Sequence, residues 1–163
     1  MTDRGLLQLA ADLRLEVEAL DRIVAEAAQC TALMADRSPT PLELRGTGDI
    51  VHELYNAVER YLERVAVEMN GGLPAGPDPH ARLLQRMAHE LPDVRPAVLS
   101  QDVARRLDEY LRFRHLFRHR YGFELEWPRL RPLIDGIAHL SPDLRRELLE
   151  FEAQVRDLAA AAD

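Results

Sequence analysis

The stretch RFRHLFRHRYGF, residues 112–123, holds the side chains of this chain best suited to acid–base and phosphate chemistry. Four arginines, two histidines and a tyrosine fall within twelve residues of a protein whose formal net charge is −7. Histidine titrates near neutral pH and can give or take a proton, whereas arginine presents a planar, permanently charged fork that fits a phosphate group. The stretch therefore predicts either a site that handles phosphate or a solvated helix end, where the macrodipole favours basic residues.

The segments that must position this stretch have the apolar period of helices. The helix expected over residues 2–36 buries one stripe, and a second expected helix buries another before it stops at NGGLPAGPDP, residues 70–79. The two stripes are Leu6, Leu9, Leu13, Val17, Leu20, Val24 and Ala28, and Ile50, Leu54, Val58, Tyr61 and Val65. Both predict long helices packed against neighbours.

Three further helices are expected in the rest of the chain. One runs from about His80 to Leu91, and one opens at Ser100 or Gln101 and ends before Gly122. The last begins at the cap signal Ser141–Pro142 and runs nearly to the end of the chain. Because no stretch shows sustained strand alternation, we predict an all-α fold, a bundle of long helices that forms one domain over residues 1–163.

Arg114 has an unusual place on the expected helix. It falls in the middle of the face formed by Val103, Leu107, Tyr110, Phe117 and Tyr121. Its aliphatic stem could cover apolar surface while the charge reaches water, or the guanidinium could pair with a carboxylate, and neither arrangement requires a function. A phosphate site is the alternative.

Spacing adds a pattern to this composition. Arg114, His119 and Tyr121 read R-x4-H-x-Y near the end of a long helix, and the stretches GDIVHELYNAVERYLERVA, NGGLP and LDEYLRFRHLFRHRYGFELEW accompany it. Together they resemble the HEPN superfamily, in particular the HepT-like ribonuclease toxins, over roughly residues 46–135. The position after the motif arginine is often asparagine in that family and is His115 here.

The resemblance implies a metal-independent endoribonuclease toxin that cleaves cellular RNA, has no cofactor and forms an antiparallel helical bundle. Arg114 and His119 would be catalytic, and Arg118 and His115 would support phosphate binding. Cleavage needs a base for the 2′-hydroxyl, an acid for the leaving 5′-oxygen and positive charge for the phosphorane, and one histidine cannot be base and acid at once. HEPN proteins are generally homodimers, so two copies of His119 could share these roles.

The same resemblance implies control by a partner. A nucleotidyltransferase antitoxin would neutralise the protein, with Tyr121 as the acceptor of an adenylyl group. Positions five apart on a straight helix differ by about 140° in direction. Arg114 and His119 must therefore converge either by loosening of the helix before Gly122 or across the dimer.

Composition sets limits on these readings. The negative net charge excludes a surface coated in nucleic-acid-binding charge, so any RNA contact must be local. The single cysteine, Cys30, and the lack of a long apolar run lead us to expect a cytoplasmic protein with no membrane segment. Two alternatives stay open: a catalytically silent HEPN module that binds nucleic acid or a nucleotide, and a helical protein-interaction domain.

Other histidines carry weaker signals. His115 and His119 are four apart and could bind a metal on one helical face, but no carboxylate or cysteine near them completes a ligand set, so we expect no metal site. His52 and Asn56, also four apart, suggest a polar network near the site, although we expect them at the surface. We expect the same of His80, His89 and His139, which have no motif around them.

Overall fold

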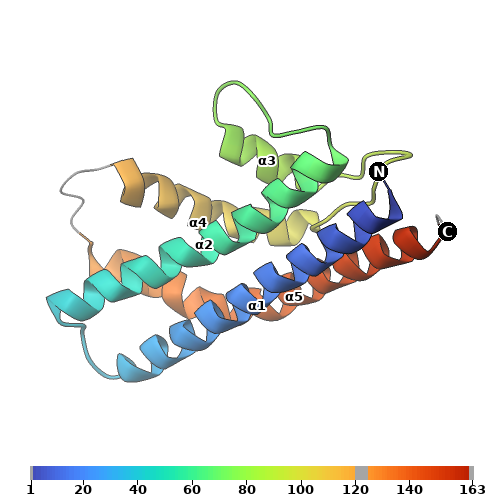
Figure 1. The fold of residues 1–163 in the computed structure, drawn as a ribbon. Helices are drawn as coiled ribbons and strands as arrows, with labels where there is room; N and C mark the ends of the chain where they lie inside the picture. The colour runs from blue at the N-terminus through green and yellow to red at the C-terminus, as the bar shows by residue number, and fades with distance from the viewer. Residues whose placement is uncertain (1, 120–124, 162–163) are drawn as a thin grey trace.

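The computed structural model describes residues 2–119 and 125–161, with only the backbone for Arg118 and His119, and this part of the chain is all-α. Its helices are α1 (Asp3–Leu33), α2 (Pro41–Met69), α3 (Pro79–Met87), α4 (Gln101–His119) and α5 (Trp127–Ala161). Helix α1 runs antiparallel to both α2 and α5, so the start of α1 and the end of α5 lie at the same end of the bundle (Figure 1). The predicted all-α bundle of long helices is confirmed.

The long helices begin where capping residues satisfy their first backbone donors. The side chain of Thr40 accepts from the backbone of Glu43, and the Glu43 carboxylate accepts in return from the backbone of Thr40, which forms a capping box at the start of α2. Ser100 opens α4 in a similar way, because its hydroxyl accepts from the backbone nitrogen of Val103 at 3.2 Å. The predicted start of α4 is therefore confirmed.

The last helix differs from its prediction. We expected it to begin at Ser141, but α5 begins at Trp127 and carries Pro132 and Pro142 in its interior. A proline inside a helix costs one hydrogen bond and a steric clash, about 3 kcal/mol. Burial outweighs this cost, because one apolar stripe continues across both prolines and packs into the core. The stripe consists of Leu130, Ile134, Ile137, Leu140, Leu144, Leu148, Phe151 and Val155.

Buried side chains of all five helices form the core; α1 packs along α2 and α5, and α4 packs against α2 and α5. Tyr61 of α2 ties two of these helices together, since its buried hydroxyl donates to the backbone oxygen of Leu148 at 2.7 Å. Gly48 lets the end of α4 come close to α2, because a Cβ at this position would lie 2.8 Å from Leu125 Cδ1 and 3.2 Å from Phe117 Cε2. Phe117 of α4 and Leu125 therefore pack against the first half of α2.

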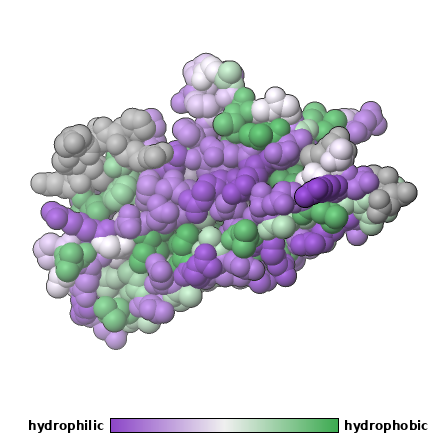
Figure 2. Space-filling model, viewed as in Figure 1, coloured by the Kyte–Doolittle hydropathy of each residue, from purple (hydrophilic) through white to green (hydrophobic). Residues whose placement is uncertain are grey.

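The visible surface is mostly hydrophilic over α2 and carries scattered hydrophobic residues along α1 (Figure 2). Two of the exposed apolar side chains of α1 are Leu7 and Leu15. Within the described residues, none of the helices is both long enough and apolar enough to span a membrane.

Candidate functional site between α2, α3 and α4

A polar stripe on α2 faces the helix that carries the motif arginine. Gly48, His52, Asn56 and Glu59 recur at intervals of three or four residues, so they lie along one side of α2. Each of them meets α4 or the segment that follows it, through the contacts described below. The stripe therefore sets the position of the last turns of α4.

Arg114 is buried in this interface, with only 5% of the residue exposed. Its Nε donates to Asn56 Oδ1 at 2.8 Å, and its Nη2 donates to Glu59 Oε2 at 2.5 Å. The guanidinium carbon also lies 5.9 Å from the centre of the Tyr55 ring, a cation–π distance. Of the arrangements expected for Arg114, the structure shows the pairing with a carboxylate, and this pairing fixes the plane of the guanidinium.

Glu59 joins this arginine to a histidine of another helix. Its second oxygen, Oε1, lies 2.6 Å from Nδ1 of His80, at the start of α3. The carboxylate is 6% exposed, whereas the His80 side chain is 44% exposed. His80 thus lies at the surface as expected, but it is not isolated there, because α3 packs its first turn against α2 and brings this ring onto a buried acid.

His52 is placed differently from its expectation. It is buried, at 9% exposure, rather than at the surface. Asn56 Nδ2 lies 3.2 Å from His52 Nδ1, and the His52 ring lies 5.0 Å from the ring of Phe117. The polar network suggested by the spacing of His52 and Asn56 is confirmed. Its physical basis is that α4 covers this side of α2.

The buried carboxylate of Glu59 perturbs its neighbours. Burial, with the charge of Glu59 as the next cause, raises the pKa of the Glu63 carboxyl above its ordinary value. Burial and the same charge also raise the pKa of the Tyr55 hydroxyl, which stays protonated at neutral pH. The stripe thus holds the Glu59 carboxylate between two basic side chains and disfavours a second negative charge at Glu63.

A groove of about 680 Å³ opens beside this network, between the start of α3 and the outer side of α4. His80 lines one wall, and Arg112, Arg114 and His115 line the other. Arg112 is exposed and paired with Asp108 at 2.5 Å on its own helix. The structure therefore brings Arg114 and His115, two of the predicted site residues, to one groove and adds His80 to them.

The other predicted site residues are located only by their chain positions. Arg118 and His119 are in the last turn of α4, and their side chains lie outside the described residues, as does Tyr121 altogether. The backbone stays α-helical through His119. Arg114 and His119 thus keep the regular helical spacing of about 140° in direction.

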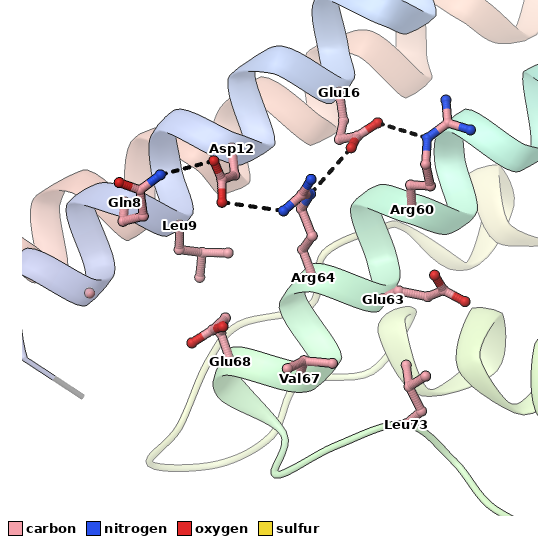
Figure 3. A pocket seen from close by; sticks show the side chains of 11 residues that line it. Gln8, Leu9, Asp12, Glu16, Arg60, Glu63, Arg64, Val67, Glu68 and Leu73 are labelled. Atoms are coloured by element: carbon pink, nitrogen blue, oxygen red, sulfur yellow. Dashed lines mark hydrogen bonds and ion pairs between the residues drawn. The ribbon is translucent and has the colours of Figure 1, made fainter.

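A second hollow of about 440 Å³ lies between α1 and the carboxyl-terminal half of α2 (Figure 3). Four of its charged side chains pair with one another: Arg60 and Arg64 donate to the two oxygens of Glu16, and Arg64 also donates to Asp12. Both arginines are held by acids that line the same hollow, so the arrangement does not point to an anionic ligand. Among the residues that the structure describes, no group of three His, Cys, Asp or Glu side chains is placed to hold a metal ion.

Sequence reasoning missed Glu59, the residue that joins the network together. A signal was present, because His52, Asn56 and Glu59 place polar side chains at i, i+4 and i+7, beside the apolar stripe of the same helix. Such a stripe indicates a helix face that meets polar partners rather than the core. The sequence does not name those partners.

The fold and the site define an all-α helical bundle with a buried arginine–glutamate pair beside a groove. Residues 46–155 match the sequence family described as HepT-like protein. The chain belongs to this HepT-like family of HEPN proteins. No curated protein and no solved structure gives a significant match.

The matched region begins at the residue where the sequence resemblance begins and extends through most of α5. It includes the whole polar stripe of α2, the groove and the R-x4-H-x-Y stretch. Helix α1 lies before it, yet α1 packs along both α2 and α5.

Proposed function

We propose that this protein is an endoribonuclease toxin that cleaves cellular RNA without a metal ion, with Arg114 and His119 as its catalytic residues. Membership of the HepT-like family suggests ribonuclease activity of this kind. The observation that carries the proposal is the burial of Arg114 in a fixed orientation at the wall of a groove. We further propose that residues 1–163 form one domain, because α1 completes the core that α2 and α5 share.

The geometry suits Arg114 for binding the phosphate of the scissile bond. Asn56 and Glu59 engage Nε and Nη2, and neither bond uses Nη1. A phosphate oxygen in the groove would therefore meet a donor whose direction is already set, so little entropy is lost on binding. Positive charge fixed in this way stabilises the extra negative charge of the phosphorane. His115, on the same wall, and Arg118 would support the phosphate.

We propose that the active protein is a homodimer with α4 near the two-fold axis. The helical backbone of α4 through His119 supports convergence of Arg114 and His119 across the dimer. Two copies of His119 would then divide the roles of base and acid. Two features offer apolar surface for such a contact. One is the exposed side chain of Leu116 on α4, and the other is a hollow beside α4 lined in part by Phe113, Leu125 and Leu130.

We propose that a nucleotidyltransferase antitoxin neutralises the protein by attaching AMP to Tyr121. Tyr121 is two residues past His119 in the motif. The added phosphodiester would bring a negative charge beside Arg114 and Arg118 and would occupy the place of the RNA phosphate. Inhibition would then require no change of fold.

A second function is favoured by one observation. The charge of Arg114 is already balanced by a buried carboxylate, and this arrangement would suit a catalytically silent module that binds nucleic acid or a nucleotide. Such a module binds RNA and leaves it intact. A helical protein-interaction domain would neither bind RNA nor cleave it.

The deciding experiment incubates the purified protein with total RNA in the presence of EDTA. We expect cleavage by the wild type, and its loss in His119→Ala and Arg114→Lys. Lysine keeps a cation next to Glu59 but loses the planar fork, so it tests phosphate binding with less damage to the fold than alanine. Arg105→Lys, an exposed arginine in the first turns of α4, is the matched control and should cleave normally. Wild-type cleavage by either site variant would show that the assigned residues are wrong.

Control by AMP is tested by co-expression with the nucleotidyltransferase and measurement of the intact mass. We expect one or more AMP additions to the wild type and none to Tyr121→Phe. Additions that persist in Tyr121→Phe would place the modification elsewhere. Neutralisation without any change of mass would favour simple complex formation.

A further inference from the structure

We propose that His80 is a second proton-transfer residue of the cleavage site and takes the proton of the attacking 2′-hydroxyl. This inference rests on the proposed ribonuclease function and deepens it. It gives His80 the role of base that was assigned above to a second copy of His119, and His119 remains the acid. One catalytic histidine per chain cannot act as base and acid at once, and the groove contains a histidine outside the R-x4-H-x-Y motif. Its position comes from α3, a helix that the motif does not include.

The contact with Glu59 prepares His80 for this role. Nδ1 lies 2.6 Å from Glu59 Oε1, and a carboxylate accepts, so Nδ1 carries the hydrogen in that bond. In the neutral ring, the lone pair is then on Nε2, which is the atom that can accept a proton. A buried acid that orients a histidine and stabilises the imidazolium formed during reaction is the arrangement found in serine hydrolase triads.

The scaffold holds the ring in place while leaving it accessible. His80 follows Pro79, the first residue of α3, and α3 is anchored by the buried side chains of Leu83, Leu84 and Met87. Glu59 is 6% exposed and cannot move freely, whereas the His80 side chain is 44% exposed. A ligand in the groove can therefore reach the imidazole of His80.

One carboxylate fixes His80 relative to Arg114. Glu59 Oε1 bonds His80, and Glu59 Oε2 bonds Arg114 Nη2. Both residues also line the same groove. A phosphate held by Arg114 would therefore lie beside the imidazole, as a base for the adjacent 2′-hydroxyl requires.

The reaction balances with two histidines. The 2′-hydroxyl gives its proton to His80 Nε2, and the 2′-oxygen forms a bond to phosphorus. The bond from phosphorus to the 5′-oxygen breaks, and that oxygen takes a proton from the imidazolium of His119. The products are a 2′,3′-cyclic phosphate and a 5′-hydroxyl, and proton exchange with water restores both histidines.

The charges around His80 come from three elements. Glu59 and Glu63 belong to α2, Asp78 precedes α3, and Asp108, Arg112, Arg114 and His115 belong to α4. Because these groups surround the ring, the test compares variants over a range of pH rather than at one value.

The test uses the full chain and an oligoribonucleotide that spans a site cleaved by the wild type in total RNA. Glutamine at position 80 can still donate to Glu59 but cannot accept the proton. We expect His80→Gln to lower kcat by about 100-fold or more, with KM changed only a few-fold. The acidic limb of the pH profile of kcat should flatten, since that limb reports the base. His89→Gln, an exposed histidine just after α3, is the matched control and should retain both limbs.

Chemical rescue separates catalysis from structural support. His80→Ala opens space at the exposed rim of the groove, and we expect added imidazole to restore part of its activity. Activity of His80→Gln equal to that of the wild type with both limbs intact, or a loss in His80→Ala that imidazole does not reverse, would overturn this assignment. Absence of cleavage by the wild type would instead refute the proposed function, and the role of His80 would fall with it.

Discussion

Separating Arg114 from Glu59 is the perturbation whose outcome the structure specifies most sharply. Both side chains are 6% exposed, and their atoms are 2.5 Å apart. Removal of one member of a buried pair leaves an uncompensated charge and costs about 3–5 kcal/mol. For a chain of 163 residues, at about 2–4 °C per kcal/mol, this corresponds to a fall in Tm of roughly 6–20 °C.

The assay is thermal and urea unfolding of Arg114→Met, Glu59→Gln and the double variant at pH 7. We expect each single variant to be strongly destabilised and the double variant to lie closer to the wild type than their sum, because it removes both charges. Arg112→Met removes an exposed pair on the same helix, so its cost should stay below about 1 kcal/mol. The prediction of a coupled buried pair would be refuted if the losses were strictly additive, or if the single variants were no less stable than Arg112→Met.

This prediction changes how the catalytic test must be made. The sequence alone suggests that Arg114→Ala should remove activity and leave the fold intact. The structure shows that the same change strips Glu59 of one of its two basic partners. Loss of activity in Arg114→Ala would thus mix two effects, and the milder Arg114→Lys separates them.

The remaining predictions concern the charge of Glu63, the hydrogen bond of Tyr61 and the proposed dimer. The pKa of Glu63 is raised in the folded protein, so ionisation of this carboxyl opposes folding. The stability that the protonated carboxyl contributes is fully present below its pKa in the unfolded chain, about 4.3, and is lost as the pH rises through its higher pKa in the folded protein. Glu63→Gln should therefore raise the urea midpoint at pH 7 but not near pH 4, and a lower midpoint at pH 7 would contradict this. Tyr61→Phe removes the hydrogen bond to the Leu148 oxygen and should lower the free energy of unfolding by about 0.5–1.5 kcal/mol. Thermal unfolding measures this loss, and an unchanged Tm would show that the bond does not contribute to stability. Sedimentation at micromolar concentration should give a dimer for the wild type and a monomer of 18.6 kDa for Leu116→Asp, whereas a stable wild-type monomer would count against a shared site.

The sequence by itself determined the helical fold and the position of Arg114. Apolar period and capping residues are local properties, and they located α1, α2 and the start of α4 to within a few residues. Arg114 stood out because a charge on an apolar stripe must find a partner when the stripe is buried. The family resemblance rested on the same local stretches, which the family match then included.

Local rules were wrong at α5. Ser141 followed by Pro142 is a good start signal, yet the helix passes through it. The cap preference is worth about 1 kcal/mol and an interior proline costs about 3 kcal/mol. Both are smaller than the free energy gained by burying a long apolar stripe. Only packing against α1 and α2 decides whether the helix starts at Trp127 or at Ser141.

Only the tertiary structure decided which residues share the groove. Glu59 and Arg114 are 55 positions apart, and Glu59 and His80 are 21 apart, so no periodic pattern connects them. Their contact depends on how α2, α3 and α4 are aligned along one another, and that alignment is set by the whole core. A residue that reads as an isolated surface histidine in the sequence thus becomes the partner of a buried acid once three helices pack together.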